Sequence, residues 1–70
     1  MRVELNGAAA DLPAGVAVRD VVVRMGRDPD QPGLAVAVNG HVVRRTEWAA
    51  TMLHDGDRVE VVTAVQGGAQ

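Results

Sequence analysis

The first residues of the chain alternate polar and apolar side chains. Residues 2–5 read arginine, valine, glutamate, leucine, the pattern of a strand with one buried face. Asn6 and Gly7 follow directly, and both residue types tolerate the positive φ of a type I′ hairpin turn. The pattern therefore predicts that residues 8–12 return as an antiparallel second strand.

A change of period marks one helix. Apolar residues recur at the i, i+3, i+4 and i+7 positions Val18, Val21, Val22 and Met25. Gly26 is a natural end for it. Ala17 stands at the expected N-cap, where serine, threonine or aspartate would serve better, so packing must hold this valine-rich helix in place.

The second half of the chain again reads mainly as strands. Prolines, aspartates and glycine make residues 27–33 an exposed loop. The strand expected at residues 34–38 is apolar throughout, which suggests complete or nearly complete burial on both sides. The chain then contains, in this order, a second asparagine-glycine turn, a strand at 41–44, a short helical turn within 46–52, a tight turn at 55–57 and a last strand at 58–65.

Two strands, one helix and further strands predict an α+β roll. We interpret it as a ubiquitin-like β-grasp, with a four- to five-stranded mixed sheet and one main helix packed across it. Analogy with ubiquitin-like proteins places the first and last strands side by side and parallel in the middle. Residues 1–65 are expected to form the domain, and residues 66–70 a flexible glycine tail.

The composition excludes several classes of function. The chain is 47% hydrophobic and 23% charged, as globular proteins are, but it contains no cysteine, lysine or serine. The familiar nucleophiles, a disulfide framework and a zinc-thiolate site are thus excluded. A net charge of −2 and a single aromatic residue argue against nucleic acid, and no long apolar run suggests a membrane segment. We expect a cytoplasmic protein without a bound cofactor.

Few side chains are candidates for chemistry. His41 and His54 are the strongest general bases by type, but we expect both to be solvated surface residues, and we expect no metal site. The acids around Gly56 lack calcium-loop spacing and are interpreted as turn residues. Trp48 is expected to fill the core. Arg44 and Arg45 are interpreted as a solvated pair, with an acidic partner as the alternative.

The end of the chain stands out, because Val65 and Gln66 lead into Gly67 and Gly68. Glycine has no Cβ, so such a segment can enter a slot too narrow for any side chain. From Val65 to Gly68 the extended reach is about 13 Å. The tail is thus long enough to enter another protein's active site while the domain stays outside.

These features together resemble the thiamin sulfur carrier (ThiS-like) family over residues 2–68. The resemblance rests on their order and spacing. The segments that carry it are the first asparagine-glycine turn, PAGVAV at 13–18, AVAVNG at 35–40, V-x-R-x-x-W from Val43 to Trp48, DGDRVEVV at 55–62 and the glycine pair.

The resemblance implies a carrier and not an enzyme. A ubiquitin-activating-type partner would use ATP to adenylate the carboxylate of Gly68. Sulfur would then give a thiocarboxylate, which donates its sulfur to thiazole synthase during assembly of the thiamin thiazole. Val65, Gln66 and Gly67 would be inserted into the partner. The family's working form ends at the second glycine, whereas Ala69 and Gln70 follow it here. We expect a peptidase to remove them; the alternatives are that they are not native or that this member carries no sulfur.

Two other functions stay open. One is a sulfur carrier for molybdopterin, cysteine or a secondary metabolite. The other is a β-grasp module that binds a protein without covalent chemistry. Arg58, Glu60 and Val62 would share the face of the last strand opposite its buried valines, and an exposed Val62 there would suit partner docking.

Overall fold

The computed structural model describes residues 1–63, and its strands and helices follow the order that the sequence predicts. The strands are β1 (Arg2–Leu5), β2 (Ala8–Asp11), β3 (Leu34–Val38), β4 (His41–Val43) and β5 (Arg58–Thr63). The helices are α1 (Val18–Arg24) and a 3₁₀ turn at Arg45–Glu47.

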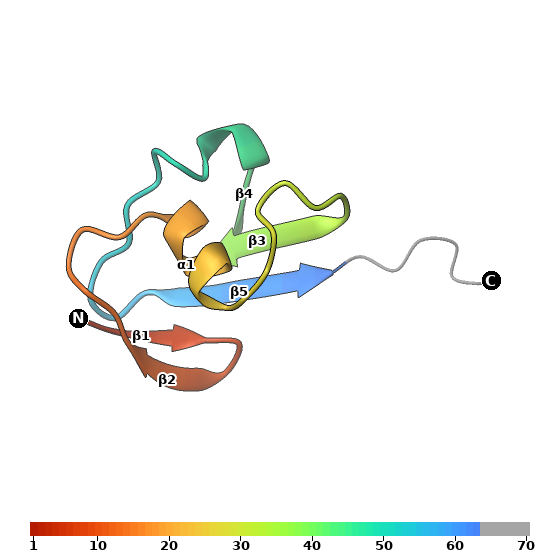
Figure 1. Cartoon of the computed structure of the whole chain (residues 1–70). Coiled ribbons are helices and arrows are strands. Elements are labelled where there is room, and N and C mark those ends of the chain that lie inside the picture. The colour runs from red at the N-terminus through yellow and green to blue at the C-terminus, as the bar shows by residue number, and fades with distance from the viewer. Residues whose placement is uncertain (64–70) are drawn as a thin grey trace.

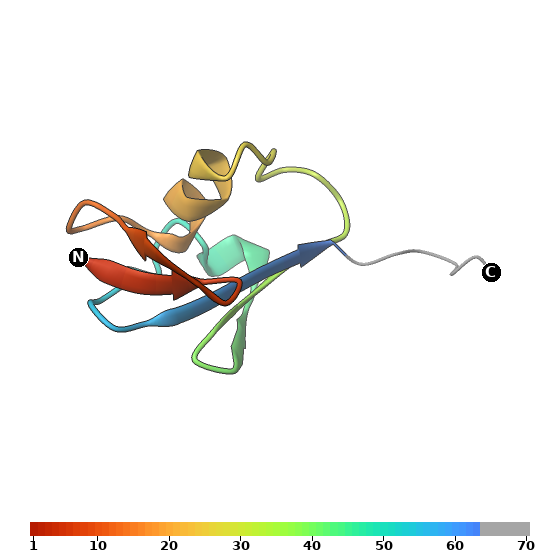
Figure 2. The ribbon, with the colours of Figure 1, turned by 90° about the horizontal axis from the view of Figure 1, so that it is seen from below.

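The five strands form one mixed sheet in the order β2-β1-β5-β3-β4. β1 and β5 are parallel neighbours at its centre, and the other pairs are antiparallel. Helix α1 lies over one side of this sheet (Figures 1 and 2). The predicted α+β β-grasp is confirmed, with five strands.

The core lies between α1 and the sheet. Val18, Val21 and Val22 have no exposed surface, so packing holds the valine-rich helix as expected. The other core side chains come from the strands and connecting segments, and include Val3, Leu12, Leu34, Val36, Trp48, Leu53, Val59 and Val61. Within residues 1–63, no helix is long and apolar enough to cross a membrane.

The start of α1 is held without a side-chain cap from Ala17. The Asp20 carboxylate accepts a hydrogen bond from the backbone N–H of Ala17 at 2.9 Å. The carbonyls of Thr51 and Trp48 accept from the first two helical N–H groups at 2.9 and 3.1 Å. These contacts occupy donors that a helix leaves unpaired at its N-terminus, so alanine is tolerated at the cap position.

The expectation that β3 is buried on both sides is wrong. Leu34 and Val36 are buried, but Ala35, between them, is exposed. Large and small side chains alternate within this apolar run. The large side chains face the helix, and the small alanines face outward, where exposing their little apolar surface to water costs little free energy. One face of the sheet is therefore open.

Candidate functional site

The predicted tail lies outside the described residues. Val65, Gln66, Gly67 and Gly68 all follow Thr63, the last residue of β5. What the structure describes is the base of the tail and the sheet face beside it. In Figure 1, β5 ends on the side of the molecule away from the N-terminus.

β5 extends beyond the end of β1, its neighbour on one side. On the β1 side, backbone pairing ends where the N–H of Asn6 donates to the carbonyl of Val59 at 2.9 Å. The Asn6 side chain then continues the pairing by one residue: its Oδ1 accepts from the N–H of Val61 at 2.8 Å, and its Nδ2 donates to the Val61 carbonyl at 3.2 Å. A side-chain amide thus takes the place of a strand residue.

On the other side, β3 supports β5 to its last described residue. Leu34, the first residue of β3, lies opposite Thr63. Because β3 begins there, neither neighbouring strand extends past Thr63. The described part of β5 therefore ends level with the first residue of β3 and extends beyond its last contact with Asn6, which is at Val61.

The second asparagine-glycine turn also holds β5, at its beginning. Asn39 Oδ1 accepts from the N–H of Arg58 at 2.9 Å, and its Nδ2 donates to Asp57 Oδ1 at 3.0 Å. Both asparagines have positive φ, 50° for Asn6 and 52° for Asn39, which confirms the predicted turns. The strand that leads into the tail is thus tied at both ends by the two hairpins.

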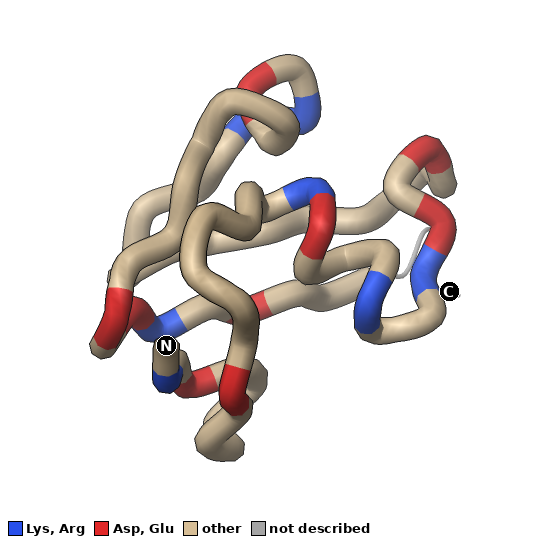
Figure 3. The backbone as a smooth tube through the Cα atoms, turned by 60° about the vertical axis from the view of Figure 1, so that its left-hand side comes forward, with Lys and Arg blue, Asp and Glu red and all other residues tan. Residues whose placement is uncertain are grey.

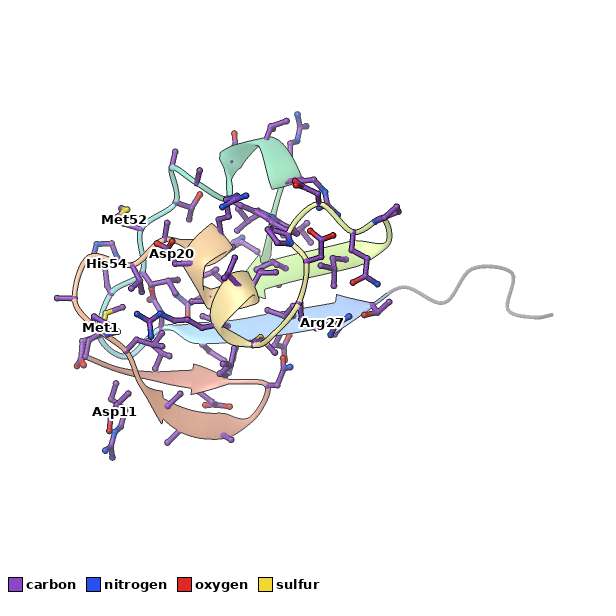
Figure 4. All side chains as sticks on the ribbon, viewed as in Figure 1. Met1, Asp11, Asp20, Arg27, Met52 and His54 are labelled. Atoms are coloured by element: carbon purple, nitrogen blue, oxygen red, sulfur yellow. The ribbon has the colours of Figure 1, made fainter. Side chains whose placement is uncertain are left out.

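The side chain of Thr63 is held by the helix layer. It lies on the same face of β5 as the buried Val59 and Val61, and its Oγ1 accepts a hydrogen bond from Nη2 of Arg27. Figure 4 shows Arg27 beside the end of β5. This contact links the loop after α1 to the last described residue of β5.

The proposed docking residues share the open face as predicted. Arg58, Glu60 and Val62 are all exposed, and Val62 keeps 55% of its surface. Val62 lies opposite Ala35, while Ala37 lies opposite Glu60 on one side and opposite Val42, 78% exposed, on the other. The structure thus adds a strip of apolar residues that the sequence reading missed, running across β5, β3 and β4.

Charge is not concentrated at this face. Acidic and basic residues intermingle along the backbone (Figure 3). Next to the apolar strip, Glu4 lies opposite Arg58 on the open side of β1 and β5. Further out, a hydrogen bond from Arg2 to Asp11 and the charge of that arginine lower the pKa of Asp11, and the pKa of Arg2 is raised in return.

Arg45 is exposed, as expected, but it also makes contacts that the sequence analysis did not predict. Its guanidinium donates to the carbonyls of Pro29 and Gln31, the latter at 2.5 Å, and lies 4.6 Å from the centre of the Trp48 ring. Trp48 is buried as predicted, with Nε1 donating to the Val43 carbonyl at 2.8 Å. The V-x-R-x-x-W spacing was the signal for this stack, because the two side chains meet one helical turn apart.

The remaining candidates do not converge on a catalytic site. His41 and His54 are exposed, and His54 Nδ1 lies 3.9 Å from the carboxylate of Asp57. Asp55 Oδ1 accepts from the backbone N–H of Arg2 at 2.8 Å, the structural role expected of a turn residue. Among the described residues, no three metal-ligating side chains gather.

The chain is similar to known proteins along nearly all of its length. A model described as the ThiS family matches residues 3–68. The sulfur carrier protein ThiS of Escherichia coli is 31% identical over 68 residues, which cover 97% of this chain and all of that protein. A thiazole synthase of Magnetococcus marinus is 32% identical over 68 residues, 97% of this chain but 20% of the synthase.

Two solved structures are similar to this chain in fold. The crystal structure of a thiamine biosynthesis protein, ThiS, from Geobacter metallireducens superimposes with a TM-score of 0.82 at 26% identity, covering 97% of this chain and all of that one. A solution structure of a thiamine biosynthesis protein from the same organism gives 0.76 at 27% identity, covering 97% and 88%.

Proposed function

The chain belongs to the ThiS family, and from that premise we propose that it carries sulfur for the thiamin thiazole through the carboxylate of Gly68. The observation that carries this proposal is the match to a sulfur carrier over that protein's whole length and 97% of this chain. We also propose that a peptidase first removes Ala69 and Gln70, because Gly68 otherwise has an amide in place of a free carboxylate.

The chemistry belongs to the partners. The Gly68 carboxylate attacks the α-phosphorus of ATP on a ubiquitin-activating-type enzyme, which forms an acyl-adenylate and releases pyrophosphate. A sulfide-level sulfur nucleophile then adds to the acyl carbon and AMP leaves, so that a thiocarboxylate remains. Adenylation makes this possible because it gives the acyl carbon a stable leaving group. The carrier supplies the terminus and binds no cofactor; ATP is bound by the activating enzyme, in the cytoplasm.

The recipient in this proposal is thiazole synthase. A stretch of a known thiazole synthase is similar to 97% of this chain, which supports an association between the two activities. The same chemistry would serve a carrier of another pathway, so the recipient is tested separately. Transfer of labelled sulfur from the thiocarboxylate to thiazole synthase, and not to a molybdopterin or cysteine pathway enzyme, is the expected result.

The open face is the proposed docking surface for the activating enzyme. Val62 extends from it together with Arg58 and Glu60, and it shares the face with Val42. Burying one valine stabilises a complex by roughly 1.5 kcal/mol or more, about a tenfold change in KM. Val62→Glu should therefore raise the KM of adenylation at least tenfold. Val23→Glu on α1 is the matched control, because Val23 is 50% exposed on the other side of the molecule.

The central test compares three forms of the chain. The form that ends at Gly68, mixed with the activating enzyme and ATP, should release pyrophosphate. The chain with all 70 residues and a chain that ends at Gln66 should release none, although both should give the same circular dichroism spectrum. A non-covalent binding module, the alternative that the exposed Val42 and Val62 favour, would bind its partner equally in all three forms.

A further inference from the structure

Among residues 1–63, the outer edge of β2 has no partner strand. β2 is the first strand in the order of the sheet, and only β1 pairs with it (Figure 1). Met1 and Leu12 exchange both backbone hydrogen bonds, at 2.7 and 2.8 Å, so alternate pairs of this antiparallel hairpin are joined in the same way. The pairs in between contain Ala9 and Asp11. The N–H and C=O groups of these two residues therefore point away from β1, toward the free edge.

The side chains of β2 do not block this edge. Edge strands are commonly protected by lysine, proline, a bulge or a covering segment. β2 consists of three alanines and Asp11, and Pro13 follows only after the strand has ended. The opposite edge is less accessible, because β4 has three residues and the Arg44 carbonyl directly after it accepts from the N–H of Glu47 at 2.8 Å. β2 is therefore the edge to which a further strand can be added.

A shallow hollow lies beside this edge on the open face of the sheet. Its volume is about 390 Å³, and it is lined by Arg2, Val3, Glu4, Gly7, Ala9 and Gly56. Ala9 lies opposite Glu4 on the same face. A strand added along β2 would place the side chain opposite Ala9 on this face too, over the Ala9 methyl group and toward Glu4.

The charges around the hollow favour a basic side chain there. Arg2 already donates to Asp11 at 3.1 Å, whereas no ion pair within residues 1–63 includes Glu4. Arg58 lies opposite Glu4 in register, and Asp55 Oδ1 accepts from the backbone N–H of Arg2 at 2.8 Å. These five side chains are three carboxylates and two guanidiniums, an excess of one negative charge. A cation is therefore the favoured occupant of the hollow.

The spacing across Ala9 suits a lysine or arginine on the added strand. Bonded pairs of an antiparallel ladder have Cα atoms about 5.5 Å apart and the pairs between them about 4.5 Å, so the Cα of the added residue lies about 10 Å from that of Glu4. With bonds of about 1.5 Å, an extended lysine side chain reaches about 6 Å and a glutamate side chain about 4 Å. The cation and the Glu4 carboxylate can therefore meet above Ala9.

We propose that β2 is a docking edge to which a partner protein adds an extended segment as a sixth strand, with a lysine or arginine opposite Ala9. The backbone of that segment forms two hydrogen bonds with Ala9 and two with Asp11, and its neighbouring apolar residues contact Ala8 and Ala10. In such strand addition the backbone gives affinity and alternate side chains give specificity. A second copy of this chain fits less well, because β2 contains no basic residue to place opposite Ala9.

The test is a titration of the full chain with a short peptide, followed by ¹H–¹⁵N NMR. The probe is blocked at both ends and has the sequence threonine-valine-lysine-valine-threonine, which places lysine opposite Ala9 and the valines opposite Ala8 and Ala10. One control peptide has glutamate in place of lysine. A second control carries a methyl group on the backbone nitrogen of lysine, so it lacks the donor that faces Ala9.

The amide signals of Ala9 and Asp11 should shift together and saturate, with a Kd of about 1 mM, because a short peptide loses conformational entropy on binding. The N-methylated peptide should bind about fivefold more weakly, since one net hydrogen bond is lost. The glutamate peptide should also bind less tightly than the lysine peptide. Glu4→Gln should weaken binding of the lysine peptide about threefold and reduce the difference between the lysine and glutamate peptides.

A matched pair of variants tests the edge itself. Ala9→Lys keeps the backbone N–H but brings a charge of its own beside Glu4, so it should weaken binding of the lysine peptide about fivefold. Ala49→Lys is the control, because Ala49 is an exposed alanine outside the sheet and the change in charge is the same; it should leave binding unchanged. Ala9→Pro removes the outward N–H without touching a bond of the hairpin, and it should weaken binding by a similar factor. Circular dichroism checks the fold of each variant.

Three results would overturn the proposal. They are no saturable shift at Ala9 and Asp11 up to about 10 mM peptide, ten times the expected Kd; equal binding by Ala9→Lys and the unaltered chain; and shifts centred on Val42 and Val62 instead. Sedimentation equilibrium without peptide tests for a second copy: a dimer that Ala9→Lys abolishes would also contradict the proposed partner. None of these measurements involves adenylation, so their outcome is independent of the proposed function.

Discussion

Replacing Asn6 with glycine should release the end of β5 that precedes the tail. Glycine accepts the positive φ of 50° without strain, so the turn stays possible and the change removes mainly the two side-chain hydrogen bonds to Val61. Each such bond contributes about 0.5 to 1.5 kcal/mol net. The expected loss in the free energy of unfolding is about 2 kcal/mol, and the expected fall in Tm is about 10 °C for a domain of this size.

The assays are urea unfolding and hydrogen exchange. The urea midpoint should fall with an unchanged m value, and exchange protection should fall first at the Val61 amide. Asn39→Gly is the matched control, because Asn39 has nearly the same φ but pairs with Arg58 at the beginning of β5. It should weaken protection at the Arg58 amide and spare Val61. If Asn6→Gly leaves the Val61 amide protected, the idea that a side chain substitutes for a strand residue is wrong.

Three further changes test the body of the domain. Asp20→Ala should lower the free energy of unfolding by about 1 kcal/mol in urea, because the N–H of Ala17 loses its acceptor. Trp48→Phe should lower the free energy of unfolding by about 2 kcal/mol in urea unfolding followed by circular dichroism. The reason is that the buried side chain becomes smaller and loses the Nε1 hydrogen bond. Arg2 lowers the pKa of Asp11 in the folded state. The contribution of this exposed pair to the free energy of unfolding is therefore fully present above the pKa that the carboxyl has in the unfolded chain, and it is lost as the pH falls below about 4. The urea midpoint of Asp11→Asn should therefore fall slightly less than that of the unaltered protein as the pH is lowered below about 4.

The fold follows from local patterns to a large extent. Alternation, two asparagine-glycine turns and one run of helical spacing are each local signals, and together they give the element order. Trp48 could be placed in the core because a single large aromatic in a valine-rich chain has few other places to pack. The two-sided burial expected for β3 was wrong, because that expectation counted Leu34 and Ala35 alike as apolar. The alternation of large and small residues, which the sequence contains, marks the buried and the exposed face.

The base of the candidate site was only partly predictable. The alternating letters of the last strand placed Arg58, Glu60 and Val62 on one face, as the structure has them. The contacts of Arg27 and Arg45 were missed, because both side chains reach groups that are remote in the sequence. Long flexible side chains give no periodic signal, so only tertiary structure shows what they bind.

The most direct test of the carrier role is the intact mass of the protein isolated from its own cells during thiamin limitation. The account predicts a species that has lost Ala69 and Gln70, together with a species heavier by the difference between one sulfur and one oxygen atom. Fragmentation should place that sulfur on Gly68. A protein that keeps both terminal residues and gains no sulfur under these conditions would contradict the account.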